Sequence, residues 1–326
     1  RAINAGINYI DTAYPYHKGE SEPFLGRALK KYPRNSFYLA TKLPVWLVNS
    51  VEDAERLFKE QLSRLQTKYI DYYLLHALDA GRWEKLVKEG IIEWAEAKKA
   101  SGKIRHLGFS FHDTYPVFRE ILTYRQWDFC QIQYNYINRA YQAGDEGLAY
   151  AAEKGLAVII MEPLLGGRLA NLSEHVAEVF SQDKTSVEHA LDFLWDKKEV
   201  SLLLSGMGTE QQVEDNLVYA GRSAVGMLTA EEKKQYEKAK EIYDKMSMVD
   251  CTGCAYCMPC PFGLNIPELF KAYNTYGPEG KDGMKREYEK QQVRSDSCRS
   301  CHRCEKVCPQ NIKISEQMKK IAELMK

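Results

Sequence analysis

Short runs of β-branched and aromatic residues alternate with longer amphipathic stretches through most of the chain. The amphipathic stretches have helical spacing: in Val51–Leu65, for example, Leu57 and Phe58 fall on the same face as Leu62. Similar helices are predicted over Gly90–Ala100 and Glu210–Tyr219. The short runs predict seven strands, at Ile7–Ile10, Phe37–Thr41, Ile70–Leu75, Ile104–Phe109, Phe129–Tyr134, Leu156–Met161 and Val200–Leu204.

The spacing of these runs indicates a parallel sheet. Successive strands start 30, 33, 34, 25, 27 and 44 residues apart, which leaves room for a crossover helix in each connection. Residues 1–6 read as the end of a helix, so an eighth strand is expected upstream. Eight strand–helix units and the lack of a G-x-G-x-x-G motif favour a (β/α)₈ TIM barrel over an open doubly wound sheet. We therefore predict a TIM barrel without its first strand.

Polar side chains stand at the carboxyl ends of the predicted strands, where barrel enzymes place their chemistry. They are Asp11, Lys42, His76, Ser110, Gln133 and Glu162. An acid, a lysine and a histidine on three consecutive strands would face one mouth of the barrel.

Composition and charge narrow the class of protein. The 326 residues carry 45 Lys and Arg against 45 Asp and Glu, so the net charge is zero. The chain has no excess of positive charge that would attract nucleic acid. No apolar run reaches the roughly 18 residues of a membrane span, and no leader precedes the first predicted helix. We expect a soluble cytoplasmic protein.

The cysteines divide the chain. Of nine, only Cys130, interpreted as a core thiol, lies outside the last quarter. The other eight form two runs with two- or three-residue gaps, each followed by proline, and the second run has the spacing of bacterial ferredoxins. In such proteins the fourth cysteine of each run ligates the other cluster. We predict two [4Fe–4S] clusters, one on Cys251, Cys254, Cys257 and Cys308, the other on Cys298, Cys301, Cys304 and Cys260.

Two zinc ions are the alternative for eight thiols, but zinc usually takes its ligands in separated pairs. Helices predicted at Pro267–Asn274 and Met284–Gln292 make this a helical ferredoxin-like domain. The predicted organisation is a barrel over 1–228, a helical linker over 229–248 and an iron–sulfur domain over 249–326. Exposed clusters are labile to oxygen, so an oxygen-poor setting is expected.

Several motifs of the first 220 residues resemble the aldo-keto reductase family. They occur in that family's order: Asn8-Tyr9-Ile10-Asp11-Thr12-Ala13, Gly19-Glu20-Ser21-Glu22, Ala40-Thr41-Lys42, Asp71-Tyr72-Tyr73-Leu74-Leu75-His76, Gly108-Phe109-Ser110 and Gln131-Ile132-Gln133-Tyr134-Asn135. With its cysteine tail, the chain is similar to the branch of the family that carries a C-terminal iron–sulfur domain.

The resemblance implies a catalytic tetrad of Asp11, Tyr16, Lys42 and His76. Carbonyl reduction needs a hydride at carbon and a proton at oxygen. Tyr16 would supply the proton, and an ammonium beside it, Lys42 held by Asp11, favours its phenolate and strengthens the acid. His76 would orient the substrate oxygen. Tyr14 competes for the acid's role, but Tyr16 has the family's spacing from Asp11.

The resemblance also implies a site for NADP(H) or NAD(H). Its phosphate loop would be Gly206, Met207, Gly208 and Thr209, followed by Gln212 and Asn216. Ser110 and Gln133 would also contact the cofactor. Two positions depart from the family: His112 stands near its usual asparagine and Glu162 near its usual aromatic. His112 or Glu162 would take over the role of the family's residue at its position. Alternatively, a redox partner other than a nicotinamide would bind at this mouth of the barrel; a flavin is one candidate, although no motif in the chain supports it.

These observations predict an oxidoreductase acting on a small-molecule carbonyl or alcohol. The clusters would exchange electrons with a ferredoxin or flavoprotein carrier, or would be purely structural. The competing hypothesis is an electron-transfer or partner-binding protein whose barrel is catalytically idle.

Overall fold

The computed structural model describes residues 1–326 and contains one parallel sheet of seven strands in chain order. The strands are β1 (Tyr9–Asp11), β2 (Tyr38–Leu43), β3 (Ile70–Leu78), β4 (Ile104–Phe111), β5 (Phe129–Gln133), β6 (Ala157–Met161) and β7 (Leu202–Leu203). Each overlaps the run predicted for it, and β1 and β7 are the edge strands. The fold is the TIM-type α/β architecture that the spacing predicts.

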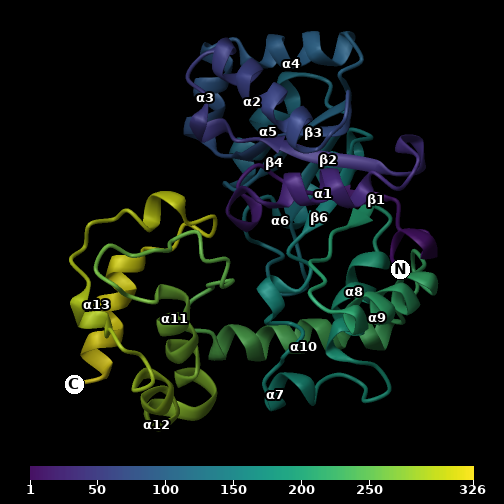
Figure 1. The fold of residues 1–326 in the computed structure, drawn as a ribbon. Helices are drawn as coiled ribbons and strands as arrows, with labels where there is room; N and C mark the ends of the chain where they lie inside the picture. The colour runs from purple at the N-terminus through teal and green to yellow at the C-terminus, as the bar shows by residue number, and fades with distance from the viewer. The chain divides into compact units, whose positions relative to one another are not determined.

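Helices that lie between the strands or follow them cover the outer face of the sheet (Figure 1). They are α1 (Ser21–Leu29), α2 (Val51–Arg64), α3 (Ala80–Lys88), α4 (Ile91–Ala100), α5 (Tyr115–Tyr124), α6 (Gly144–Glu153) and α9 (Glu210–Gly221). On the inner face Ala40, Leu74, Phe129 and Ile159, from β2, β3, β5 and β6, form one buried cluster. Burial on both faces explains why β3 is almost continuously apolar.

The chain folds into two compact units that do not follow chain order. One holds residues 1–134, 138–163 and 194–226, and includes the whole sheet. The other holds 135–137, 164–193 and 227–326. The second unit includes α7 (Glu174–Ala177), most of α8 (Ser186–Trp195), and the helices from α10 (Ala230–Met246) onward.

An aromatic cluster joins three distant segments of the second unit. The ring of Tyr236, on α10, lies 5.5 Å from Tyr136, 5.2 Å from Phe180 and 5.1 Å from Phe193. Its hydroxyl donates to the carbonyl of His189 at 2.8 Å. Thus α10, which contains most of the predicted linker, packs firmly through its buried face.

The cysteine-rich part contains α11 (Ile266–Asn274), α12 (Tyr276–Tyr288) and α13 (Ile314–Leu324) around a small core that includes Leu269, Phe270, Met284 and Met318. Helix α11 confirms the first helix predicted here. The second prediction, Met284–Gln292, was wrong in both bounds: α12 begins eight residues earlier and ends at Tyr288. Glycines hid its first half, which kinks at Gly280, where φ is +67°.

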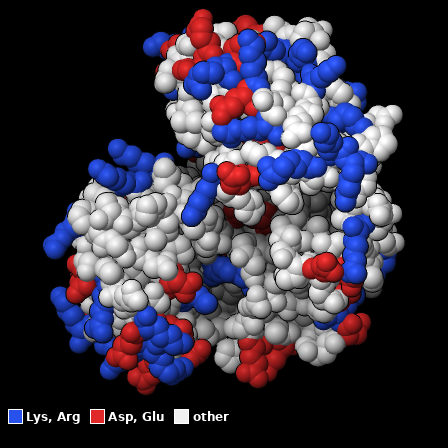
Figure 2. Space-filling view, viewed as in Figure 1, with Lys and Arg blue, Asp and Glu red and all other residues white.

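Charges of both signs are interspersed on the face that Figure 2 shows, in keeping with a net charge of zero. No helix combines the length and the apolar character that a bilayer crossing requires.

Candidate functional site

Asp11 and Lys42 form an ion pair at the carboxyl ends of β1 and β2. Lys42 is fully buried, and its Nζ donates to the two carboxylate oxygens of Asp11 at 2.8 and 2.7 Å. The third proton goes to the carbonyl of Thr12 at 2.8 Å. Burial raises the pKa of Asp11, and the adjacent Lys42 opposes that rise. All three ammonium protons are therefore committed, and the pair is fixed in place.

Tyr16 lies beside this pair in the turn that follows β1. The ammonium of Lys42 is 4.9 Å from the centre of its ring, and the ring of His76 is 6.0 Å away. Burial, and then the carboxylates of Asp11 and Glu162, raise the pKa of Tyr16. The Asp11 carboxylate opposes the effect expected of Lys42 on the phenolate, and that effect stays a prediction. The phenol therefore stays protonated, as a proton donor must before it reacts.

A β-bulge positions His76. The pairing of β3 with β4 shifts register between Leu75 and Leu78, and Ala77 adopts a left-handed φ of +56°. The Ala77 amide donates to Ser110 Oγ at 2.7 Å, so Ser110 anchors the bulge. Burial, and then the charge of Lys42, hold the pKa of His76 well below its usual value. His76 is thus a neutral imidazole.

Trp46 was missed by sequence reasoning. Its ring lies 5.1 Å from that of His76, and the residue is 41% exposed. It belongs to the turn Val45–Leu47, directly after β2. Its position could have indicated a role, because Trp46 is an aromatic residue in a loop after a strand, and such loops line the mouth of a barrel.

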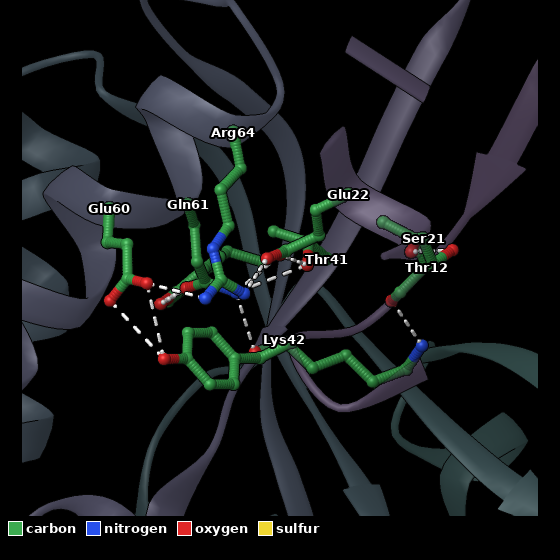
Figure 3. Close-up of polar contacts among 10 residues, drawn as sticks. Thr12, Ser21, Glu22, Thr41, Lys42, Glu60, Gln61 and Arg64 are labelled. Atoms are coloured by element: carbon green, nitrogen blue, oxygen red, sulfur yellow. Dashed lines mark hydrogen bonds and ion pairs between the residues drawn. The ribbon is translucent and has the colours of Figure 1, made fainter. Parts of the chain in front are cut away.

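A buried polar network holds the backbone of β2 at Lys42 (Figure 3). Gln61 Nε2 donates to the Lys42 carbonyl at 2.9 Å and to Glu22 Oε1 at 2.8 Å. Thr41 Oγ1 donates to the same Glu22 oxygen at 2.6 Å, and the Tyr73 hydroxyl donates to Gln61 Oε1 at 2.7 Å. Lys42 is therefore fixed at both ends, at its carbonyl and at its ammonium. The roles of Gln61 and Glu22 in this network could not be predicted from the sequence. Each lies on a helix, where a polar residue is usually expected on the exposed face.

The amide of Gln133, at the end of β5, is buried and has no hydrogen-bond partner at either its nitrogen or its oxygen. A primary carboxamide would satisfy both atoms, because it offers one acceptor and two donors. The predicted cofactor contact therefore fits this residue. Ser110 is already engaged by Ala77, and Glu162 follows β6 with a left-handed φ of +54°.

His112 follows β4, and its contact with Gln142 opposes the effect of burial on its pKa. Burial lowers its pKa from 6.5 to about 4, so folding must exclude a proton that the unfolded chain binds between these values. We expect His112 alone to lower the unfolding free energy by about 2 kcal/mol as the pH drops from 6.5 to 4, a value discounted because the residue is only partly buried. Urea unfolding at pH 7 and 4.5 measures it.

His112→Phe should reduce this acid destabilisation, whereas His17→Gln, at an exposed position, should leave it unchanged. Equal acid sensitivity in the wild type and His112→Phe would contradict the assignment.

The predicted phosphate loop precedes α9. Thr209 caps the helix, accepting at Oγ1 from the amide of Gln212 at 3.2 Å. The Gln212 side chain in turn accepts from the Gly208 amide at 2.7 Å, and Asn216 Nδ2 donates to Ser205 Oγ at 2.9 Å. Gly206 and Met207 lie in the same loop. The structure therefore places five of the six predicted residues at the N-terminus of α9, where backbone amides favour anions, while Asn216 lies further along the helix.

The eight tail thiols surround two separate pockets. Cys251, Cys254, Cys257 and Cys308 line one, and Cys260, Cys298, Cys301 and Cys304 line the other. These are the two predicted sets. Burial, and then the neighbouring Cys251 and Cys254, raise the pKa of Cys257 to about 12. Four thiols lining each pocket are the number that one cubane needs. Cys130 is fully buried, far from either set in sequence.

Comparisons with solved structures show similar folds. The aldo-keto reductase AKR11C1 from Bacillus halodurans (holo form) matches with a TM-score of 0.64 and 29% identity, over 73% of this chain and 84% of that one. An aldo-keto reductase from Klebsiella pneumoniae in complex with NADPH matches with a TM-score of 0.60 and 25% identity, over 73% and 81%.

Curated relatives have similar coverage or less. L-galactose dehydrogenase of Arabidopsis thaliana is 31% identical over 242 residues, which are 66% of this chain and 74% of the relative. NADH-specific methylglyoxal reductase of Escherichia coli (strain K12) is 34% identical over 186 residues, 52% of this chain and 56% of the relative.

Family models agree with these relatives along most of the chain. That of the Aldo/keto reductase family matches residues 1–241, and that of the 4Fe-4S dicluster domain matches residues 247–312. The chain is thus a member of the aldo/keto reductase family of oxidoreductases, with a 4Fe-4S dicluster domain after its barrel.

Proposed function

We propose that this protein reduces a small-molecule carbonyl, or oxidises the corresponding alcohol, with NAD(H) or NADP(H). The arrangement of Tyr16 and His76 beside the buried Asp11–Lys42 pair carries this proposal. When bound, a nicotinamide supplies or accepts the hydride. Gln133 would hold its carboxamide, and the loop from Gly206 to Thr209 would face its phosphates.

The protein's own residues would handle the proton. The Tyr16 hydroxyl makes no hydrogen bond within the protein, so it is available to donate to the substrate oxygen. His76 is neutral, and a neutral imidazole donates a hydrogen bond to that oxygen without giving up its proton. Lys42 and Asp11 hold the surrounding charges fixed while the alkoxide develops.

The relatives suggest the first substrates to test. Reduction of methylglyoxal with NADH and oxidation of L-galactose with NAD⁺ cover both directions of the reaction. Each assay is repeated with NADPH or NADP⁺. Turnover of either substrate that is lost in a Tyr16 variant supports the proposal. Nucleotide binding without turnover of any carbonyl would favour the alternative, an electron-transfer protein with an idle barrel.

We further propose that residues 249–326 form a domain with two [4Fe–4S] clusters, joined by 229–248 to a barrel over 1–228. A ferredoxin or flavoprotein would be its electron carrier. Two clusters predict about eight iron and eight sulfide ions per chain after anaerobic reconstitution.

Cys257→Ser removes one thiolate of the first set and should lower the iron content to about four per chain. Cys130→Ser, which changes a buried thiol of the sheet unit, should retain all of it. Zinc in place of iron, or an equal loss of iron in both variants, would contradict the two-cluster assignment. Analysis of iron, zinc and acid-labile sulfide gives the answer.

A further inference from the structure

A cleft of about 520 Å³ opens in the second unit beside the first thiol set, and its volume is typical of sites for small molecules. Three chain segments form its walls: residues 166–176 after β6, residues 243–253 around the end of α10, and residues 267–278 of α11 and the start of α12. All of them lie within one compact unit. The proposed catalytic residues all belong to the other unit, and none of them lines this cleft.

The cleft presents a fixed cation without an acidic partner. Arg168 is partly buried; its guanidinium donates to Ser247 Oγ at 3.0 Å and to the Val249 carbonyl at 3.4 Å, and it lies 4.9 Å from the centre of the Tyr243 ring. It pairs with no carboxylate. Lys271, on α11, also lines the cleft and forms no ion pair, while Glu268 is the one acid among the lining residues. This arrangement favours an anionic ligand.

The floor of the cleft is rigid and has an unused hydroxyl. Asn274 Oδ1 accepts from the amides of Met248 and Val249, each at 2.9 Å, and fixes the segment that leads to the cysteines. Gly166, at φ +64°, approaches so closely that a Cβ would lie 1.9 Å from the Thr252 carbonyl oxygen. Thr252 is only 6% exposed, lines the cleft, and its Oγ1 has no hydrogen-bond partner. A ligand in the cleft would supply that partner.

The position of the cleft suggests that its ligand is redox-active. Cys251 lines both the cleft and the pocket inside the first thiol set. A molecule bound here would therefore contact a proposed cluster ligand. Leu172, Val176 and Met246 add apolar wall, which suits a flat ring system.

We propose that this cleft binds a flavin mononucleotide-type cofactor, with its phosphate at Arg168 and Lys271 and its ring system toward Cys251. The choice of a flavin among possible anions rests on the proposed function. A hydride carries two electrons, an iron–sulfur cluster exchanges one, and a flavin can do both. An oxidised flavin takes up a hydride to form its reduced anion, which can return two electrons singly and one proton. A flavin in this cleft would thus place a two-electron carrier beside a proposed one-electron cluster.

Binding is tested on the anaerobic, cluster-loaded full chain without substrate or nicotinamide. FMN is titrated by fluorescence quenching and by equilibrium dialysis, with riboflavin and inorganic phosphate as separate probes. We expect FMN to bind at least about ten-fold more tightly than riboflavin, because only FMN places a phosphate on the cations. Lys271→Glu should weaken FMN at least about ten-fold and leave riboflavin unchanged, and Thr252→Val should weaken both.

Lys281→Met, which changes a lysine of α12 outside the cleft, is the matched control and should bind FMN normally. Three results would overturn the proposal: no binding of FMN, equal affinity for FMN and riboflavin, or phosphate that competes as well as FMN does. Iron content checks that each variant is loaded. Carbonyl turnover is measured separately, so failure of the barrel chemistry and failure of the flavin site give different results.

Discussion

Tyr16→Phe should lower kcat for carbonyl reduction by about 10²–10⁴-fold, the usual contribution of a positioned general acid. The substitution removes one oxygen that has no hydrogen-bond partner in the protein, so the fold should be unaffected. The ring that lies 4.9 Å from the Lys42 ammonium and 6.0 Å from His76 is retained. Steady-state kinetics with each nucleotide, together with thermal unfolding, separate lost chemistry from lost stability.

Tyr14→Phe is the matched control, because Tyr14 lies in the same segment but donates its hydroxyl to Glu60 at 3.3 Å. We expect this variant to keep kcat within a few-fold of the wild type. Full activity in Tyr16→Phe, or a larger loss in Tyr14→Phe, would show that Tyr16 is not the proton donor.

Lys42→Met should abolish turnover and also destabilise the sheet unit by about 3–5 kcal/mol, as expected when one partner of a buried ion pair is removed. The Asp11 carboxylate would lose two charge-assisted hydrogen bonds, at 2.8 and 2.7 Å, and the Thr12 carbonyl would lose its donor. Burial would then act on Asp11 unopposed and raise its pKa further. Urea unfolding at neutral pH measures the loss.

The double variant Lys42→Met, Asp11→Asn tests the cause of that loss. Neutralising Asp11 removes the unpaired charge, so it should recover a large part of the lost stability and none of the activity. Lys18→Met, at an exposed lysine of the neighbouring turn, should change neither property. A double variant as unstable as Lys42→Met would show that packing, not the unpaired carboxylate, dominates.

The strands were predictable because a parallel sheet buried on both faces demands apolar runs at a regular spacing. All seven predicted runs contain a strand, and the polar residues at their ends lie at the carboxyl edge of the sheet. Periodicity carries no information about a single inserted residue, so the bulge at Ala77 that presents His76 was not foreseen. The roles of the four tetrad residues stay a prediction.

Electrostatic balance was harder to predict than position. The sequence placed Lys42 near Tyr16, but the effect of the ammonium depends on how many of its protons Asp11 and Thr12 take, which only coordinates reveal. The cysteine sets were easier, because ferredoxin-like spacing fixes which thiols share a pocket. By contrast, the assignment of residues 164–193 to the same unit as the tail has no signature in local sequence.

The aromatic cluster around Tyr236 can form only late in synthesis of the chain. Tyr136 and Phe180 leave the synthesis site long before Tyr236, which follows Tyr136 by 100 residues. At typical rates of about 5–20 residues per second, the ring of Tyr136 waits roughly 5–20 s for Tyr236, and the ring of Phe180 waits a shorter time. During that interval residues 164–193 have no α10 to pack against, so we expect this segment to complete its folding only after α10 has been made.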